Sequence, residues 1–301
     1  MTKNINPKTW NFTGAPRATY VSDDLDNSGA AAPTYAPIFA FNFNGTNGNS
    51  ASQAEFSPEP DQSPLNSLTY SNDIPGPFGE TINAKQSIVA YDAGNDSSQL
   101  RFGGTCVGGA GLTIANGDRT FFGMHVYFPN PTCFAYGAAG DGYGSLKFAR
   151  YGGSVGANRI THQLGLFQNG STQGCGLSFN QSYTSFEITG GADANTPSPL
   201  TLNVGQWNAL CWEILWQESA TGYTRTWANG NYLGEVSNIV TKPAGVGTYN
   251  DFTIGDYFNG GAFQAMTFYM QSLILTKEVP NTLDSGGRPY ISPDTQVGDF
   301  A

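Results

Sequence analysis

The chain has 301 residues and a formal net charge of −10 at pH 7, and only 12% of its residues are charged. No basic cluster offers the concentrated positive surface that nucleic-acid binding requires, and no run of about eighteen apolar residues could span a bilayer. Sparse Glu and Lys, together with 20 Phe, 15 Tyr and 39 Gly, favour strands and turns over helices. We therefore expect an all-β protein with neither a nucleic-acid partner nor a membrane partner.

Residues 1–36 differ from the rest of the chain because they have little apolar surface. They are rich in Pro, Asn and Gly, with isolated large side chains at Trp10, Phe12 and Tyr20. Such a segment cannot offset its own chain entropy. We predict an extended N-terminal arm over 1–36, held by the body of the chain, by another copy or by a different protein, followed by one β domain over 37–301.

The first residues, MTKNINPKTWNFTG, lack the apolar stretch of a secretory signal. We therefore expect either a mature form or a protein that leaves the cell by another route, such as the release of virus particles by lysis. The expected location is the surface of a virus particle.

From residue 37 onward, short strand-like runs alternate with Gly-rich breaks. Residues 38–44 begin the series with Phe39, Phe41 and Phe43 on one side of a strand, and 45–80 is typical of a turn-rich surface excursion. The later runs are 87–91, 99–102, 119–128, 145–151, 159–167, 185–189, 207–216, 223–227, 231–236, 251–254 and 265–275. About a dozen short strands separated by turns predict a two-sheet antiparallel sandwich or jelly roll.

The stretch 205–233 carries the clearest strand pattern. Its first strand has large apolar residues at every second position, on one face of the pleat: Leu210, Trp212, Ile214 and Trp216. The alternate positions take the other face. The next strand has three large side chains on one face: Tyr223, Arg225 and Trp227. Asn229 and Gly230 then predict a tight hairpin turn, because both central residues of that turn need positive φ.

The four cysteines are widely spaced: Cys106, Cys133, Cys175 and Cys211. Without a Cys-x-x-Cys pair or a His at ligand spacing, zinc is not expected, and Cys211 is best explained as a small buried hydrophobe. The run DAGNDSS at 92–98 has oxygen atoms that could chelate Ca²⁺, but such clusters are usually turns. We therefore expect no cofactor.

Three pieces of the second half form a combined pattern: GQWNALCWEIL (205–215), YTRTWANGNYLGEV (223–236), and FTIGDYFNGG followed by MTFYMQSLILTKEVP (252–280). Together they resemble the concanavalin-A-like jelly-roll superfamily, which includes lectins, laminin-G-type modules, polysaccharide lyases and glycanases. The piece YGSLKFARYG (143–152) also looks like a Lys/Arg-bearing strand of relatives from marine phages and bacteria. The resemblance covers roughly residues 85–290 and implies the fold more strongly than the function.

One position departs from this superfamily pattern. Relatives often carry an Asp in the last strand, where this chain has Gln271. A cation or catalytic role that depends on that Asp is therefore not expected here.

A lectin-like interpretation gives one set of candidate residues. Sugars stack on aromatic faces, while planar polar groups bind their hydroxyls. The predicted sheets offer Tyr151, Trp227 and Tyr257 as stacking rings, with Arg150 and Arg225 as their polar neighbours. The plainer alternative is that the aromatic residues belong to the core and that the arginines edge the sandwich.

A polysaccharide lyase would need a base for the C5 proton of a uronic acid and a cation to neutralise its carboxylate. The candidate base is His125 or Tyr257, and the candidate carboxylate clamp is Arg150 or Arg159. The run 257–264 is similar to the Y-F-K-A-G-x-Y-x-Q strand of one alginate lyase family. It is one residue short, lacks the Lys, and has Phe where the family has its second Tyr.

Two further polar residues have simple structural explanations. His162 alternates with apolar residues, so we expect a core histidine. A glycanase would need two carboxylates about 5–10 Å apart, and only Glu213 and Glu187 are candidates within the strands. Glu213 alternates with Cys211 and Leu215, so a buried polar group bonded to Arg225 explains it equally well.

The favoured function is that of a non-enzymatic structural or adhesion protein of a phage particle, as a capsid decoration or a tail component, which binds glycans through a concave sheet. An extended arm before a compact sandwich is typical of such proteins. The expected partners are other virion proteins and copies of the chain itself, bound through the arm as a closed oligomer, and glycans. The alternative is a polysaccharide lyase that acts by β-elimination.

Overall fold

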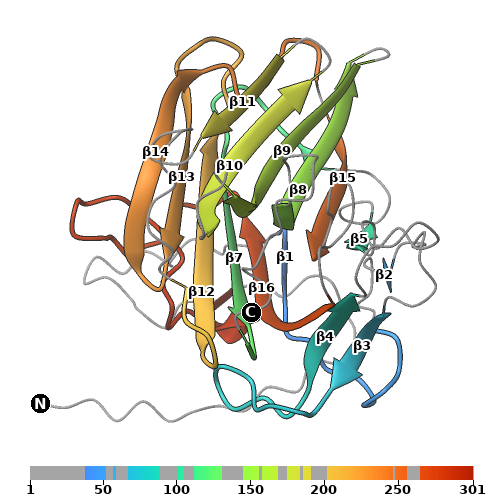
Figure 1. The fold of residues 1–301 in the computed structure, drawn as a ribbon. Coiled ribbons are helices and arrows are strands. Elements are labelled where there is room, and N and C mark those ends of the chain that lie inside the picture. The colour runs from blue at the N-terminus through green and yellow to red at the C-terminus, as the bar shows by residue number, and fades with distance from the viewer. Residues whose placement is uncertain are drawn as a thin grey trace, which may run out of the picture.

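The computed structural model describes residues 38–51, 57–58, 67–88, 101–104, 112–130, 145–155, 158–168, 175–183, 186–190, 202–246, 248–255 and 265–300. Within these ranges the chain forms two eight-stranded antiparallel sheets and one short 3-10 helix, η2 (Val297–Phe300), with no α-helix. Figure 1 shows the two sheets as stacked layers. The predicted all-β sandwich is confirmed. The predicted arm over 1–36 lies outside the described residues, so its boundary stays a prediction.

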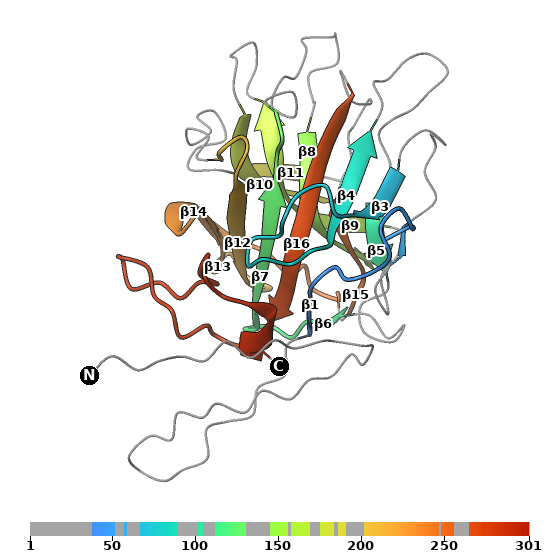
Figure 2. The same ribbon diagram turned by 90° about the horizontal axis from the view of Figure 1, so that it is seen from below.

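The first sheet contains the strands that flank the Asn229–Gly230 turn and the last long strand of the chain. Its order is β14 (Asn231–Ile239), β13 (Gly222–Ala228), β12 (Trp207–Leu215), β7 (Arg119–Tyr127), β16 (Met266–Thr276), β4 (Asn83–Ile88) and β3 (Ser67–Ser71), with β1 (Phe39–Phe41) paired to β16. Figure 2 shows β16 in the middle of this sheet, between β7 and β4.

The second sheet is built from the central part of the chain. Its order is β11 (Phe186–Gly190), β10 (Cys175–Tyr183), β9 (Asn158–Gln168), β8 (Ser145–Val155), β15 (Thr248–Gly255), β5 (Arg101–Gly104) and β2 (Ser57–Pro58), with β6 (Leu112–Thr113) paired to β15. The long strands β8 and β9 lie side by side at its centre.

The facing sides of the two sheets form one aromatic-rich core. The apolar face predicted for β12, from Leu210 to Trp216, is buried in it, which confirms the alternation. Tyr151 of β8 joins the layers, because its ring centroid lies 5.3 Å from those of both Trp212 and Trp216. The hydroxyl of Thr120 accepts hydrogen bonds from Tyr151 (3.3 Å) and from the Trp216 indole (2.9 Å), so the polar atoms of these large side chains are satisfied.

A second, smaller apolar cluster lies on the outer side of the first sheet, beneath the C-terminal segment. Its members are Phe121, Cys211, Trp227, Ile274, Ile291 and Val297. Tyr290 stacks on Trp227 with ring centroids 5.8 Å apart and ring planes within 18°. The backbone N–H of Ile291 donates to the Cys211 thiol at 3.3 Å, and Cys211 is buried as expected. The C-terminal segment, red in Figure 1, therefore covers part of a sheet face that would otherwise be exposed.

The predicted hairpin turn between β13 and β14 is confirmed by its backbone angles. Asn229 has φ of 51° and Gly230 has φ of 77°. The Asn229 side chain also donates to the Asn208 side chain at 3.0 Å, and it accepts from the backbone N–H of Ala209 at 2.9 Å. The turn is therefore tied to the neighbouring strand by side-chain bonds as well as by its backbone.

Gln271 lies at an irregularity of β16, where the register with β7 shifts and Ser272 takes φ of 53°. Its amide nitrogen donates to the carbonyl of Ile82 at 2.6 Å, and its oxygen accepts from the N–H of Phe43 at 2.6 Å. Three segments that are far apart in sequence therefore meet at one fully buried amide. Gln271 therefore has a structural role at the position where the superfamily resemblance leads us to expect Asp.

Replacing Gln271 with Met, which has a similar volume, is expected to lower the free energy of unfolding by about 2 kcal/mol, because several buried backbone groups would lose their partner. Urea denaturation followed by tryptophan fluorescence would measure the change. Asn231→Gln, at the exposed first residue of β14, is the control and should change the free energy of unfolding by less than about 0.5 kcal/mol. Equal stability of the Met variant and the native protein would contradict the assigned role.

Candidate functional site

Two of the aromatic residues predicted to stack on sugars are buried. Tyr151 is 1% exposed and lies in the core between the sheets, while Trp227 is 0% exposed and lies under Tyr290 on the outer side of the first sheet. Neither ring presents a face to a ligand in this structure. Tyr257 lies outside the described residues. The five residues predicted to bind a glycan therefore do not form one surface.

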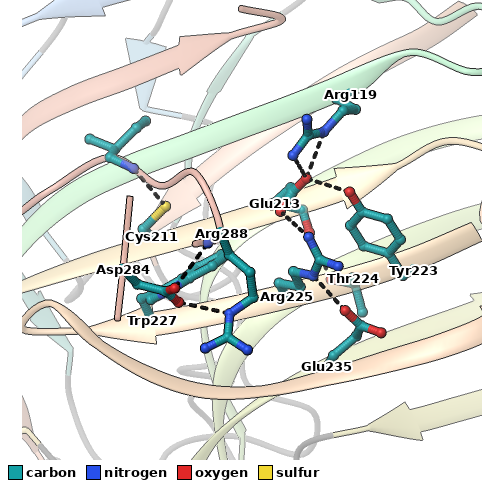
Figure 3. Close-up of polar contacts among 11 residues, drawn as sticks. Arg119, Cys211, Glu213, Tyr223, Thr224, Arg225, Trp227, Glu235, Asp284 and Arg288 are labelled. Carbon is teal, nitrogen blue, oxygen red and sulfur yellow. Dashed lines mark hydrogen bonds and ion pairs between the residues drawn. The ribbon is translucent and has the colours of Figure 1, made fainter. Parts of the chain in front are cut away.

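Arg225, another member of that set, belongs to a polar cluster on the outer side of the first sheet (Figure 3). Glu213 of β12 is fully buried, and its two oxygens take hydrogen bonds from three groups. Arg119 Nε and the Tyr223 hydroxyl both donate to Oε1 at 2.8 Å, and Arg225 Nη1 lies 3.5 Å from Oε2. Arg225 Nε also donates to Glu235 at 2.5 Å. Of the two explanations for Glu213, the structure shows the buried group in contact with Arg225.

The pKa of Tyr223 in this cluster argues against a role in acid–base catalysis. Burial and the negative charge of Glu213 raise the pKa of Tyr223 to about 12, and the neighbouring arginines only partly oppose this shift. A phenol with this pKa is a poor base at neutral pH. The cluster satisfies a buried carboxylate, which is a structural task.

His125, the predicted base, lies on the outer side of β7 in the first sheet. Its Nε2 lies 3.1 Å from the carbonyl of Pro293, and the ring of Phe78 packs against it edge-on with centroids 5.1 Å apart. Burial lowers the pKa of His125 to about 4, although the Pro293 carbonyl and the Asp294 charge act in the opposite direction. It is therefore a covered, neutral imidazole, on a different sheet from Arg150 and Arg159.

His162 is a core residue, as expected. It is fully buried, and its ring packs edge-on against Trp216 with centroids 4.8 Å apart. Burial alone lowers the pKa of His162 to about 3. Both histidines of the chain are thus neutral, and both are removed from the outer side of the second sheet.

That outer side has Arg150 of β8 near its centre. Arg150 lies directly opposite Gln163 of β9 on one side and Thr253 of β15 on the other. Asn180 of β10 lies opposite Gln163 in turn. These four residues form a polar row that crosses four strands of the second sheet. Tyr151 faces the core, so the preceding residue, Arg150, faces outward. Arg150 is nevertheless only 3% exposed.

Three more basic residues share this face with Arg150. Arg159 lies opposite Ser154 of β8. It is four positions from Gln163 in the same strand, so the two positions are on the same face of the sheet. Lys147 lies opposite Gly165, and Arg101 lies opposite Gly255. By register, all four basic residues in the strands of the second sheet are on its outer side: Arg101, Lys147, Arg150 and Arg159.

Glycines surround the polar row on the same face. Four strands contribute one each: Gly103, Gly152, Gly165 and Gly255. A glycine within a strand has no side chain to pack and often marks a place where a ligand or another backbone comes close to the sheet.

The basic residues of the first sheet and its connecting segments form ion pairs. In the described part of the chain, each one is paired with a carboxylate: Lys85 with Asp73, Arg119 and Arg225 with Glu213, Lys242 with Glu218, Lys277 with Asp118, and Arg288 with Asp284. The strands of the second sheet also contain two acidic residues, Glu187 and Asp251. By register both lie on the outer side as well, since Glu187 is opposite Ser182 and Asp251 is opposite Gly152. The strands therefore place four basic and two acidic residues on this side of an acidic protein.

The described residues contain no group of three or more His, Cys, Asp or Glu side chains placed to hold a metal ion. The calcium candidate at 92–98 lies outside them. Among the described residues there is also no helix with the length and apolarity needed to cross a membrane.

No protein-family model matches the sequence, and no curated protein matches it. Three solved structures show a related arrangement of strands. An endo-β-1,4-glucuronan lyase from the fungus Trichoderma reesei has 14% identity, with 78% of this chain and 93% of that chain covered and a TM-score of 0.49. Alginate lyase vAL-1 from a Chlorella virus has 13% identity, coverage of 71% and 89%, and a TM-score of 0.47.

The cellulose-induced protein Cip1 has 13% identity, with 75% of this chain and 93% of that chain covered and a TM-score of 0.48. At these identities and TM-scores the likeness carries nothing about ligand or chemistry. The functional argument therefore rests on the residues of the second sheet.

Proposed function

We propose that the protein binds an acidic polysaccharide on the outer side of its second sheet, with Arg150 as the central carboxylate anchor. The observation that supports this most directly is the common face of the four basic residues Arg101, Lys147, Arg150 and Arg159. A guanidinium binds a carboxylate through two parallel hydrogen bonds, which gives both strength and orientation.

The neighbours of Arg150 favour a sugar over other anions. Gln163 and Asn180 supply planar amides, and Thr253 supplies a hydroxyl. These groups are suited to the hydroxyls of a pyranose. Since Arg150 is buried, a ligand carboxylate would take the place of the group that now covers it.

Replacing Arg150 with Gln is expected to weaken binding of polygalacturonate or alginate about 10- to 100-fold, because a charge-assisted hydrogen bond would be lost. Isothermal titration calorimetry at low salt would measure the affinity. Lys85→Gln makes the same change of charge at an exposed ion pair of the first sheet and is the matched control. Equal losses in the two variants would show a general charge effect and would contradict a site at Arg150.

The lyase alternative keeps one specific observation in its favour. Arg150, Gln163 and Arg159 lie on one face, and they are the residue types that neutralise a uronate carboxylate and acidify its C5 proton. His125 lies on the first sheet and not beside these residues, so of the two predicted bases this alternative depends on Tyr257. Tyr257, two positions beyond the end of β15, is the base that this alternative requires.

Ultraviolet absorbance of unsaturated uronides, with alginate, pectin and glucuronan as substrates, would distinguish a lyase from a binding protein. A lyase would release the chromophore, and Tyr257→Phe would abolish the release while retaining binding. A binding protein would show affinity for an acidic polymer, and it would release no chromophore from any of the three. The expected place on a phage particle is a separate proposal from the sequence, which mass spectrometry of purified particles would test.

A further inference from the structure

Residues 289–297 lie against the outer side of the first sheet, and we name them the C-terminal cover. Ile291 and Val297 of the cover belong to the smaller apolar cluster on that side. Gly123 of β7 lies beneath Ile291, and a Cβ added there would be 2.9 Å from the Ile291 side chain. Glycine at this position therefore leaves the space that the cover occupies, and the cover fits closely on the sheet.

Two hydrogen bonds in the described part of the chain tie the C-terminal cover to the strands beneath it. The N–H of Ile291 donates to Cys211 Sγ at 3.3 Å, as Figure 3 shows at Cys211. His125 Nε2 lies 3.1 Å from the carbonyl of Pro293. A thiol is a weak acceptor, so the bond from His125 is the stronger of the two. The attachment of the cover therefore depends on the state of one imidazole.

The position of the proton on His125 follows from this bond. A carbonyl can only accept, so Nε2 carries the proton and Nδ1 is left as an acceptor. Nδ1 is buried and has no hydrogen-bond partner among the residues that the structure describes. A second proton on the ring would place a donor and a positive charge at a point where no described group accepts them. The closed cover therefore requires a neutral His125.

The strands around His125 supply no carboxylate to balance such a charge. The residues directly opposite it are Ala209 on β12 and Gln271 on β16. The next side chains on the same face are the phenol of Tyr127 and the buried thiol of Cys211. A proton on His125 would therefore gain little from the sheet itself.

The two segments that cover His125 contribute three acidic residues. The loop between β3 and β4 packs Phe78 edge-on against the imidazole. In that loop, Glu80 accepts a hydrogen bond from the N–H of Phe78 at 2.9 Å, and Asp73 is paired with a lysine of β4. The C-terminal cover adds the exposed Asp294. Burial has the largest effect and lowers the pKa of His125 to about 4, although the Pro293 carbonyl and the Asp294 charge oppose it.

We propose that His125 is an acid-sensitive latch, whose protonation releases the C-terminal cover while both sheets stay folded. In the released form the imidazole meets water and titrates near its ordinary pKa of 6.5, so protons favour release as the pH falls below that value. The gain levels off near pH 4, where the closed form binds the proton as well. Release uncovers the apolar strip beneath the cover, formed by Phe121, Cys211, Trp227 and Ile274.

The other covering segment is attached independently of His125. The Trp207 indole donates to the carbonyl of Pro75 at 2.8 Å, and the Asn83 amide donates to the carbonyl of Ile74 at 2.8 Å. These bonds hold the loop between β3 and β4 on the sheet whatever the charge of His125. The cover is therefore the segment that protonation of His125 frees.

The turn that precedes the C-terminal cover also keeps its attachment in mild acid. The Asp284 carboxylate accepts from the Trp227 indole at 2.9 Å and from Arg288 Nε at 2.8 Å. Burial would raise the pKa of Asp284, but the hydrogen bonds from Arg288 and Trp227 outweigh it and hold this pKa well below its usual range. Asp284 therefore stays ionised at pH 5, and release is confined to the residues after this turn.

Hydrogen–deuterium exchange of the full chain, read by mass spectrometry at pH 7.5 and pH 5, tests the proposal. After correction for the intrinsic exchange rate at each pH, the opening constant of peptides covering 289–297 is expected to be about 30-fold larger at pH 5. His125→Gln keeps an N–H donor but cannot titrate, so its opening constant should change by less than about 2-fold. His162→Gln removes the other buried histidine and is the matched control, which should retain the full pH effect.

His125→Leu provides a second variant, without the donor. Its C-terminal cover should already open more often at pH 7.5, and the opening should not depend on pH. An opening constant of the native protein that is the same at both pH values would overturn the proposal, as would an equal rise in His125→Gln. Exchange of β7 and β12 peptides that rises in step with 289–297 would also contradict it, because the whole sheet would then be unfolding.

Discussion

Replacing Arg119 and Arg225 together with Met is expected to destabilise the protein by about 3–5 kcal/mol, because the charge of Glu213 would be left buried without a cation. Glu213 is fully buried, and only the Tyr223 hydroxyl would remain to donate to it. The single variant Glu213→Gln should cost less, about 1–3 kcal/mol, because the two arginines are partly exposed and water can solvate them.

The triple variant R119M/R225M/E213L separates charge from packing. Replacing a whole buried ion cluster with apolar groups of similar size is often neutral or stabilising, so the triple variant should recover most of the stability lost in the double variant. Guanidinium denaturation monitored by fluorescence would give the three free energies of unfolding. A triple variant as unstable as R119M/R225M would show that shape, rather than charge, controls this part of the sheet.

Acidification from pH 7 to pH 4 is expected to cost about 3 kcal/mol of stability for each of the two histidines. The pKa of His125 is lowered to about 4 and that of His162 to about 3 in the folded protein. An unfolded histidine titrates near 6.5. Below that pH the unfolded chain therefore binds protons that the folded chain cannot, and stability falls until the folded pKa is reached.

Thermal unfolding at half-unit steps between pH 7 and pH 4 would measure this loss. His125→Leu and His162→Met should each remove about half of the pH dependence in this window, whatever their effect at pH 7. The carboxylates contribute at lower pH: the pKa of Asp284 and that of Asp73 are lowered in the folded protein, so their contribution is lost as pH falls through those lowered values. An unchanged pH profile in H125L/H162M would rule out the histidines as the cause.

Local alternation was enough to predict many of the strands and their two faces. In β12 it separated the core residues, such as Trp212, from the outer ones, such as Glu213. It missed β3 and β10, whose sequences SLTYS and CGLSFNQSY mix few apolar residues with many polar ones. These strands are specified by their neighbours in the sheet, because β-propensity depends strongly on cross-strand context.

The candidate site was predictable in part. The sequence identified Arg150 and Arg159 as residues of strands, but not that Arg150 lies opposite Gln163. That pairing depends on an irregularity of β8 between Lys147 and Ala149, and a slip of one residue would place Arg150 on the other face. Alternation in the sequence also identifies the two faces of a strand, but it does not identify the face that another segment of the chain covers. Trp227 was therefore predicted as a sugar platform, although the C-terminal segment lies over it.

Cys211 lies under the C-terminal segment, so the reaction rate of its thiol reports whether that segment is in place. Burial raises the pKa of this thiol well above its usual range, so it reacts slowly while Ile291 is in place. Reaction of a disulfide reagent at Cys211, separated by peptide mass spectrometry from reaction at the other three cysteines, would therefore measure how often the C-terminal segment lifts away. Labelling kinetics would count these openings in native buffer, with no engineered dye.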